Sequence, residues 1–532
     1  MKKIALFVSV FAFVGSVFAL EVNTTELQSL NGNTEIEFIN YEGPHSVINT
    51  VAQIKGIGSE IGAQVAGNLE KSDRIGNNAR YSVIHAVDTS VKEKLDADIL
   101  IIGSESQLDH INNLRRIISG YLTAAYKYSE TDADTLAVFI TVYNAVYRAK
   151  LDVFAEKYKE AVISHLESEI CGLSVDYHDW AGKTQIVIPL FDVTNGGLST
   201  IDTSVISDKN VVSSMKEDDD KNIQSRKNLV DIKERESETA NQNAKDAQKK
   251  AAEDNKKLDE EKARTEQAKK DAEAAKKDAD EKQKIAAQNP DDKQAQEDAK
   301  KAKDNAKQKQ KELEKQEEKQ KEQSEKTEKS REESKKQQEL ADKKDSEAQK
   351  ERKDIAIDQV AVQREKAEND AAGSEYALII LDEKKPLLGI VRYNKVSGKQ
   401  IKKPAVNVIR SRQMINLGDK FLTIAGENKG NGAVKLVLID KETLEIAQES
   451  EEMVSETSVI VPDGGEYYCV INEKGSYHIG RFDSNLKLKS KSVEKVKAGT
   501  PITINANAIA VTGADGKVKV LNKADISTLI GE

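Results

Sequence analysis

The chain of 532 residues is acidic, with 91 Asp and Glu against 81 Lys and Arg and a formal net charge of −10. A protein that binds nucleic acid needs a basic surface to neutralise phosphates, so this charge argues against nucleic acid as a partner. Aromatic residues make up only 5% of the chain, and residues 192–375 contain none. Two regions that can build a hydrophobic core therefore flank one that cannot, and we expect a multidomain protein.

Residues 1–19 have the pattern of a signal peptide. Positive charge at Met1-Lys2-Lys3 precedes an apolar run, and Val17-Phe18-Ala19 resembles a cleavage site with small residues at its first and third positions. The run is shorter than the ~20 residues needed to span a bilayer. We expect cleavage before Leu20 and an exported chain without a transmembrane segment; an uncleaved anchor is the alternative.

Residues 20–200 mix short strand patterns with longer helical ones, which predicts an α+β domain. Alternating or continuous apolar residues predict strands, and apolar residues at helical spacing predict helices. The predicted strands are Ile36–Tyr41, Ile99–Gly103 and Thr184–Leu190, and the predicted helices are Leu108–Tyr128 and Asp132–Arg148.

Several features of this domain suggest sites but support none. Lys55-Gly56-Ile57-Gly58 has the shape of a helix-hairpin-helix loop, which offers backbone amides to DNA phosphate, yet in an acidic, exported chain we interpret it as a tight turn between helices. The side chains of His165, His178, Asp176 and Asp179 lack metal-ligand spacing, and we interpret them as a surface cluster. We therefore predict no catalytic, cofactor-binding or metal-binding residue, and no enzyme activity.

The cysteine content is also sparse. Cys171 and Cys469 are the two cysteines, one in each foldable region. Export would permit a disulfide, but two cysteines do not make a disulfide scaffold, so we expect two buried, free thiols.

Longer stretches of the first domain carry a family resemblance. They are Glu37-Phe38-Ile39-Asn40-Tyr41 with Gly43-Pro44, Leu114-Arg115-Arg116-Ile117 with Gly120-Tyr121-Leu122, Ile140 to Arg148, and Trp180 to Leu190. Together they resemble the spirochaete (Borrelia-type) 83/100-kilodalton antigen family, over roughly residues 35–190. The resemblance implies an immunogenic envelope protein whose molecular activity is unassigned, and it supplies no catalytic or binding residues.

Residues 215–369 are dominated by Lys, Glu, Asp, Gln and Ala, which predicts a long charged helical rod. Small apolar residues recur with heptad spacing and predict a thin coiled-coil-like seam. Its positions are Ala240, Ala244, Ala247, Ala251, Leu258, Ala268, Ala272, Ala275 and Ala279, then Ala295, Ala299, Ala302, Ala306, Leu313, Ala341, Ala348, Ile355 and Val362. The seam permits self-association through the rod.

Asn289-Pro290-Asp291-Asp292 interrupts the rod and predicts two helical arms. We expect Asn289 to cap the second arm and Pro290 to occupy its first helical position. If the arms fold back, their seams bury each other and both globular domains meet at one end; if not, the molecule is a kinked dumbbell. The matched seams favour the hairpin slightly.

Residues 374–532 predict an all-β domain, because short alternating strands are separated by turn residues. The unit recurs at roughly 40–45 residues, close to the period of a propeller blade. We expect a propeller-like repeat, with an antiparallel sandwich or barrel as the alternative.

These parts predict an exported envelope antigen, located in the periplasm or associated with the outer envelope, that acts as a non-catalytic scaffold or adaptor. A helical spacer would lie between two binding domains, with unidentified envelope proteins or cell-wall components as partners. The alternatives are a peptide- or glycan-binding module in the C-terminal β domain and a cell-wall hydrolase.

Overall fold

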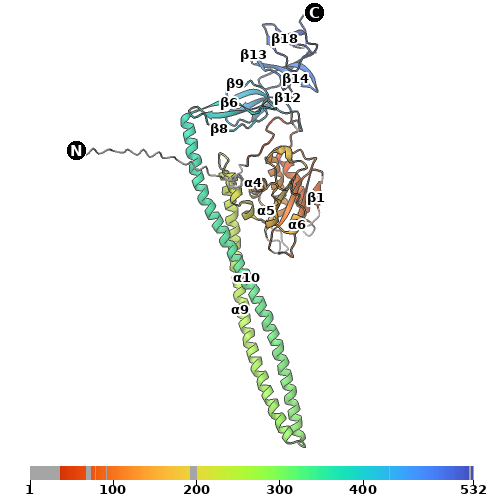
Figure 1. Ribbon diagram of the computed structural model, residues 1–532, viewed down its shortest axis with the longest axis vertical. Helices are drawn as coiled ribbons and strands as arrows, with labels where there is room; N and C mark the ends of the chain where they lie inside the picture. Colours follow the sequence, from red (N-terminus) through yellow and green to blue (C-terminus); the bar gives the residue numbers. More distant parts are fainter. Residues whose placement is uncertain are drawn as a thin grey trace, which may run out of the picture.

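The computed structural model describes residues 36–67, 74–77, 79–91, 93–191, 200–430, 432–526 and 529–530. The predicted signal peptide, residues 1–19, lies outside the described residues. The architecture is an α+β domain, a long helical hairpin and an all-β domain, which confirms the predicted fold class (Figure 1). No helix among the described residues is long and apolar enough to cross a membrane.

The N-terminal domain is built on one antiparallel five-stranded sheet in the order β1-β2-β3-β4-β5. All its pairings are antiparallel, which fits an α+β rather than a doubly wound fold. The strands are β1 (Arg74–Asn77), β2 (Tyr81–Ala86), β3 (Asp96–Ile102), β4 (Thr184–Phe191) and β5 (Thr200–Ile201). The helices are α2 (Val51–Ala66), α3 (Ile111–Tyr126), α4 (Glu130–Val146), α5 (Leu151–Lys157), α6 (Glu160–Ile163), the 3₁₀ helix η1 (Tyr177–Asp179), α7 (Thr203–Ile206) and α8 (Lys209–Met215).

Helices α2 and α3 pack closely through glycines, which corrects the interpretation of residues 55–58. These residues lie inside α2 and not in a turn. A Cβ at Gly58 would stand 1.8 Å from the carbonyl oxygen of Ile117, and a Cβ at Gly120 would stand 2.1 Å from that of Lys55. Glycine is needed here because the two backbones approach each other, not because the chain turns.

The rod is an antiparallel hairpin of α9 (Ile223–Gln288) and α10 (Lys293–Ala372), so the predicted break at Pro290 is present. Asp292, not Asn289, caps α10, because its carboxylate accepts from the backbone N–H groups of Gln294 and Ala295. Pro290 lies in the turn before the helix and not at its first position. A carboxylate next to the helix start also complements the helix dipole.

The predicted alanine seam is the surface through which the two helices pack. Buried seam positions include Ala240, Ala244, Ala251, Leu258, Ala272, Ala275 and Ala279 on α9, and Ala302, Leu313, Ala341, Ala348 and Ile355 on α10. Polar groups join the seam near its middle, where the Ser330 hydroxyl donates to the Asp254 carboxylate over 2.7 Å. Such a directional bond fixes one register for helices whose alanine layers are otherwise similar.

The fold-back brings both globular domains to the same end of the hairpin (Figure 1). The expected spacer between two domains is therefore corrected: the hairpin points away from both domains, and its turn at residues 289–292 is the free end. The physical reason is that the fold-back removes the alanine seam of each arm from water, whereas a straight rod would leave both seams exposed.

The C-terminal domain contains four antiparallel sheets that follow one another along the chain. The first is β6 (Ser374–Asp382), β7 (Leu387–Asn394) and β8 (Gln400–Lys402); the second is β9 (Ile415–Leu417), β10 (Lys420–Ala425), β11 (Lys435–Asp440) and β12 (Ile446–Met453). The third is β13 (Val461–Asp463), β14 (Glu466–Glu473), β15 (Ser476–Phe482) and β16 (Leu488–Lys495); the fourth is β17 (Thr503–Ile504), β18 (Ala508–Thr512) and β19 (Val518–Asn522).

Hydrophobic cores lie between successive sheets, so the inner sheets are buried on both faces. In β14, Tyr467 and Cys469 join the core shared with the second sheet, whereas Tyr468 and Val470 join the core shared with the fourth. Alternate residues of a strand point to opposite faces, which explains this division. One sheet per sequence repeat fits the predicted period; a closed propeller stays a prediction.

Candidate functional site

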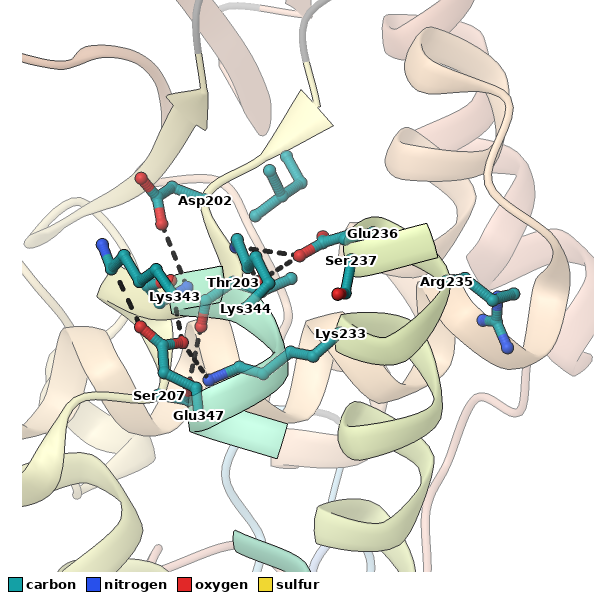
Figure 2. A network of polar contacts seen from close by, with 12 residues as sticks. Asp202, Thr203, Ser207, Lys233, Arg235, Glu236, Ser237, Lys343, Lys344 and Glu347 are labelled. Carbon is teal, nitrogen blue, oxygen red and sulfur yellow. Dashed lines mark hydrogen bonds and ion pairs between the residues drawn. The ribbon is translucent and has the colours of Figure 1, made fainter. Parts of the chain in front are cut away.

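Two sets of contacts hold the three parts of the molecule together, and they form the candidate functional site. The first is the root network, where the hairpin meets the N-terminal domain; Figure 2 shows its part around Lys233, Lys344 and Glu347. Its residues are Thr203, Ser204, Arg226, Lys233, Glu236, Lys344, Glu347, Glu351 and Asp358.

Lys344 joins three elements at the centre of the root network (Figure 2). Its Nζ lies 2.6 Å from the hydroxyl of Thr203 on α7 and 2.8 Å from the carboxylate of Glu236 on α9. The Thr203 hydroxyl in turn donates to Glu236 over 2.7 Å. Lys344 is only 5% exposed, so these partners offset the cost of removing its side chain from water.

Glu347 is the matching carboxylate on α10. It accepts from Lys233 of α9 over 2.8 Å and from the Ser204 hydroxyl over 2.9 Å. Burial would raise the pKa of Glu347, but the charge of Lys233 and the bonds from Lys233 and Ser204 outweigh burial and lower that pKa. The carboxylate is therefore ionised at neutral pH.

Arg226 is the most deeply buried charge of the root network, with 0% of its side chain exposed. Its guanidinium donates to Glu351 over 2.6 Å and to Asp358 over 2.7 Å. Burial would raise the pKa of Asp358, but the Arg226 bond and the nearby lysines lower it. A hollow of about 510 Å³ beside Arg226 is lined by both lysines and carboxylates. Arg226 Nε and Nη1 are paired with carboxylates of α10, whereas its buried Nη2 has no hydrogen-bond partner. The paired groups join α9 to α10, so the network is suited to fastening helices.

The second set of contacts is the clasp, residues 37–45, which joins the N-terminal domain to the C-terminal domain. Tyr41 is 4% exposed and belongs to the core between the first and second C-terminal sheets. Its hydroxyl donates to the Pro44 carbonyl over 2.7 Å and accepts from the Glu427 N–H over 3.3 Å. A residue from the start of the chain therefore completes a core near its end.

Backbone groups of the clasp are also bonded across the domain boundary. The Asn407 side chain donates to the Asn40 carbonyl over 2.6 Å and accepts from the Glu42 N–H over 3.2 Å. The Ala433 N–H donates to the Pro44 carbonyl over 3.1 Å. These bonds lock the path of the clasp, because an unpaired buried amide or carbonyl is costly.

Gly43 lets the clasp lie against the C-terminal domain. A Cβ at Gly43 would stand 2.4 Å from Val408 Cγ2 and 2.9 Å from the ring of Tyr41. The clasp contains the Glu37–Tyr41 and Gly43-Pro44 stretches that carried part of the family resemblance, but the sequence did not predict their role. The one signal in the sequence was the Gly43-Pro44 pair, since a Gly-Pro pair marks a turn or loop with a restricted backbone conformation.

Two titratable groups of the clasp have shifted pKa values. Burial, followed by the negative charges of Glu37 and Glu445, raises the pKa of Glu42 to about 7. The hydrogen bond to Asp109 raises the pKa of His45, against the opposing effect of burial. Both shifts favour the protonated form, so the clasp is most stable when Glu42 is neutral and His45 is charged.

The buried carboxylate of Asp98 in β3 is a third polar cluster, inside the N-terminal domain. It accepts from the hydroxyls of Tyr121 and Tyr126 and bonds to His85 Nδ1 over 2.6 Å. Asp98 is 0% exposed, so this arrangement satisfies a core carboxylate rather than presenting it to a ligand. The strand was predicted as Ile99–Gly103, whereas β3 begins three residues earlier, at Asp96.

The predicted surface cluster is divided in the structure. His178 Nδ1 lies 2.7 Å from Asp176, and Asp179 pairs with Lys183 over 2.8 Å. Among the described residues, no group of three His, Cys, Asp or Glu side chains is placed to hold a metal ion. Cys171 and Cys469 are both buried and unpaired.

The comparison with known families agrees with this architecture. A family model described as Borrelia P83/100 protein matches residues 25–502, which include the clasp, the hairpin and most of the four-sheet domain. None of the curated proteins compared with the chain matches it. Since the matched region covers nearly the whole sequence, the chain belongs to the Borrelia P83/100 protein family.

Proposed function

We propose that this spirochaetal antigen is a non-catalytic scaffold or adaptor of the cell envelope, in which the globular body binds one component and the hairpin reaches another. The observation that carries the proposal is the fold-back of the rod together with the clasp. Both domains are fastened at the base of the hairpin, and the turn at residues 289–292 projects away from them. With 66 residues, α9 is about 100 Å long at ~1.5 Å per residue, and its part beyond the root network projects from the body.

The charge pattern supports a role in reach rather than catalysis. The buried cations of the root network are bonded to carboxylates and hydroxyls of neighbouring elements. A catalytic group must instead be free to bond a substrate. Along the hairpin the outward-facing residues are mostly Lys, Glu and Gln, which keep a long helix soluble without requiring a further partner.

The proposal is tested by photo-crosslinking in intact cells. A crosslinking residue is placed at Lys282, near the tip, or at Val396, which is 82% exposed on the C-terminal domain. We expect the two positions to capture different envelope components. Ala275, buried in the seam, is the control position and should crosslink within the chain only. Capture of the same components from Lys282 and Val396 would contradict an adaptor with two separate ends.

A shortened hairpin sharpens the test. Deleting residues 258–278 together with 304–324 removes three heptads from each arm, leaves Lys282 in place and keeps the seam in register, as judged by the contact of Thr265 with Gln316. The tip would retract by about 30 Å. We expect capture from Val396 to persist and the tip contact to be lost; a tip contact that survives shortening would show that reach is unimportant.

A further inference from the structure

The first C-terminal sheet has an apolar edge strand, β6, which follows α10 directly after Gly373. Six of its nine residues, Tyr376 to Leu381, are apolar, and none of the nine is buried. Ile380 is 62% exposed and Leu381 is 42% exposed. In the described part of the chain, β6 pairs with β7 along one side only. Its other side is therefore an open strand edge with apolar side chains.

The pairing with β7 shows which backbone groups face outward. The Lys395 N–H donates to the Gly373 carbonyl, which places the backbone groups of odd-numbered residues toward β7. Because these groups alternate along an antiparallel strand, those of Tyr376, Leu378 and Ile380 point away from β7. Three N–H and three C=O groups are thus presented in a row.

The other edges of the C-terminal sheets are protected in recognisable ways. β12 carries Glu449, Glu451 and Glu452, and its pairing with β11 is interrupted by two register shifts. β16 carries several lysines and is likewise interrupted twice. The edges β8, β9, β13 and β17 have at most three residues, and Leu529 pairs beside β19. Charge, bulges, short length and cover are the devices that prevent strand pairing, and β6 has a register shift only at its last residues.

We propose that β6 pairs antiparallel with β6 of a second copy of this chain, joining two three-stranded sheets into one of six strands. With Leu378 on the two-fold axis, Tyr376 lies opposite Ile380 of the second copy, and Ala377 lies opposite its Ile379. Glu375 lies opposite Leu381 and Asp382 opposite Ser374, so no like charges face each other. The strand can therefore pair with its own copy without placing like charges opposite each other, and its apolar residues face one another, as an isologous interface requires.

This dimer differs from association through the rod, because the seam of the hairpin is already occupied within one chain. The pairing leaves the hairpin tip and the clasp uninvolved. It is also independent of the proposed scaffold function, since a self-paired β6 requires no envelope partner.

Sedimentation equilibrium of the protein without residues 1–19 tests the proposal. We expect a dimer at micromolar concentration and a Kd raised about tenfold or more in Ile380→Lys and in Ile380→Glu, because either charge would face Tyr376 of the second copy. Val493→Lys is the matched control: Val493 is 76% exposed on the edge strand β16, and its substitution should leave the dimer intact. Circular dichroism confirms that each variant is folded.

Residue-resolved hydrogen exchange identifies the interface. The amides of Tyr376, Leu378 and Ile380 should become protected as concentration rises, whereas those of Ala377 and Ile379 should be protected at all concentrations by β7. A protein that stays monomeric, a dimer that both Ile380 variants leave intact, or protection of Tyr376, Leu378 and Ile380 that does not depend on concentration would each overturn the proposal.

Discussion

The root network and the clasp fasten the same globular body by opposite chemical means. The root network uses ionised side chains, among them Arg226 and Lys344, which are nearly or fully buried. The clasp uses backbone hydrogen bonds, a buried tyrosine and a carboxyl group, Glu42, that favours its neutral form. The comparison teaches that an attachment made of charges depends on complete pairing, whereas one made of neutral groups depends on close fit. The two should therefore fail under different conditions.

The largest expected effect is at the root network. Arg226→Ala leaves Glu351 and Asp358 without their buried cation, and removing one partner of a buried ion pair costs about 3–5 kcal/mol. Hydrogen exchange of the amides at Leu229 to Ile232 measures the free energy of local opening, which should fall by that amount. An unchanged exchange rate would show that the root is held by the apolar contacts of Leu229 and Val230 alone.

The next effect is at the clasp. Gly43→Ala places a methyl group 2.4 Å from Val408 Cγ2, and overpacking of this kind costs about 1–3 kcal/mol. We expect faster exchange of the Ala433 amide, which bonds to Pro44, without a change at the root. Gly56→Ala is the control: no atom lies within 4 Å of its Cβ, and the helix should gain about 0.5–1 kcal/mol. Equal effects at both glycines would refute a fit-dependent clasp.

A smaller effect is expected from pH, which should change the stability of the clasp and the stability of the root network in opposite directions. The pKa of Glu42 is raised to about 7 in the folded protein. The contribution of Glu42 to the stability of the clasp is therefore complete at a pH below the unfolded pKa of this group, and it is lost as the pH rises through about 7. The raised pKa of His45, whose neighbours include Asp109 and Glu449, acts in the same direction. The pKa values of Glu347 and Asp358 are lowered in the folded protein. These two carboxylates therefore stabilise the root network at a pH above their unfolded pKa values, and this stabilisation is lost in acid.

Hydrogen exchange of the Glu42 and Ala433 amides, corrected for the intrinsic effect of pH on exchange, measures the pH dependence of the clasp. The amides at Leu229 to Ile232 report on the root network. Protection of the clasp should fall from about pH 6 to about pH 8 while protection of the root stays constant. Glu42→Gln should remove most of the dependence. A clasp that is equally protected across this range in the unaltered protein would contradict the raised pKa of Glu42.

The smallest effect is expected at an exposed ion pair of the same helix interface. Arg352 donates to Glu234 in two bonds of 2.5 and 2.6 Å, but 54% of the Arg352 side chain is exposed. Water screens such a pair, so Arg352→Ala should cost less than about 1 kcal/mol. This variant is the matched control for Arg226→Ala, because both arginines bind carboxylates across the hairpin. If Arg352→Ala and Arg226→Ala lower the free energy of local opening equally, burial would not explain the strength of these ion pairs.

The sequence by itself determined the local structure of most of the chain. Alanine spacing identified the inward face of the hairpin, Pro290 marked the break, and alternating strands with turn residues marked the β domain. These features follow from helix propensity, proline geometry and strand periodicity, which act over a few residues.

Only the tertiary structure decided how these parts meet. The sequence left the hairpin and the dumbbell open, because the same seam and the same turn permit both. It misread residues 55–58, because a glycine required by a neighbouring helix looks like a glycine required by a turn. It gave no sign that Tyr41 completes a core with Phe421, or that Arg226 and Asp358 form a buried pair. Those contacts join residues far apart in the chain, and their free energy depends on burial, which exists only once the chain has folded.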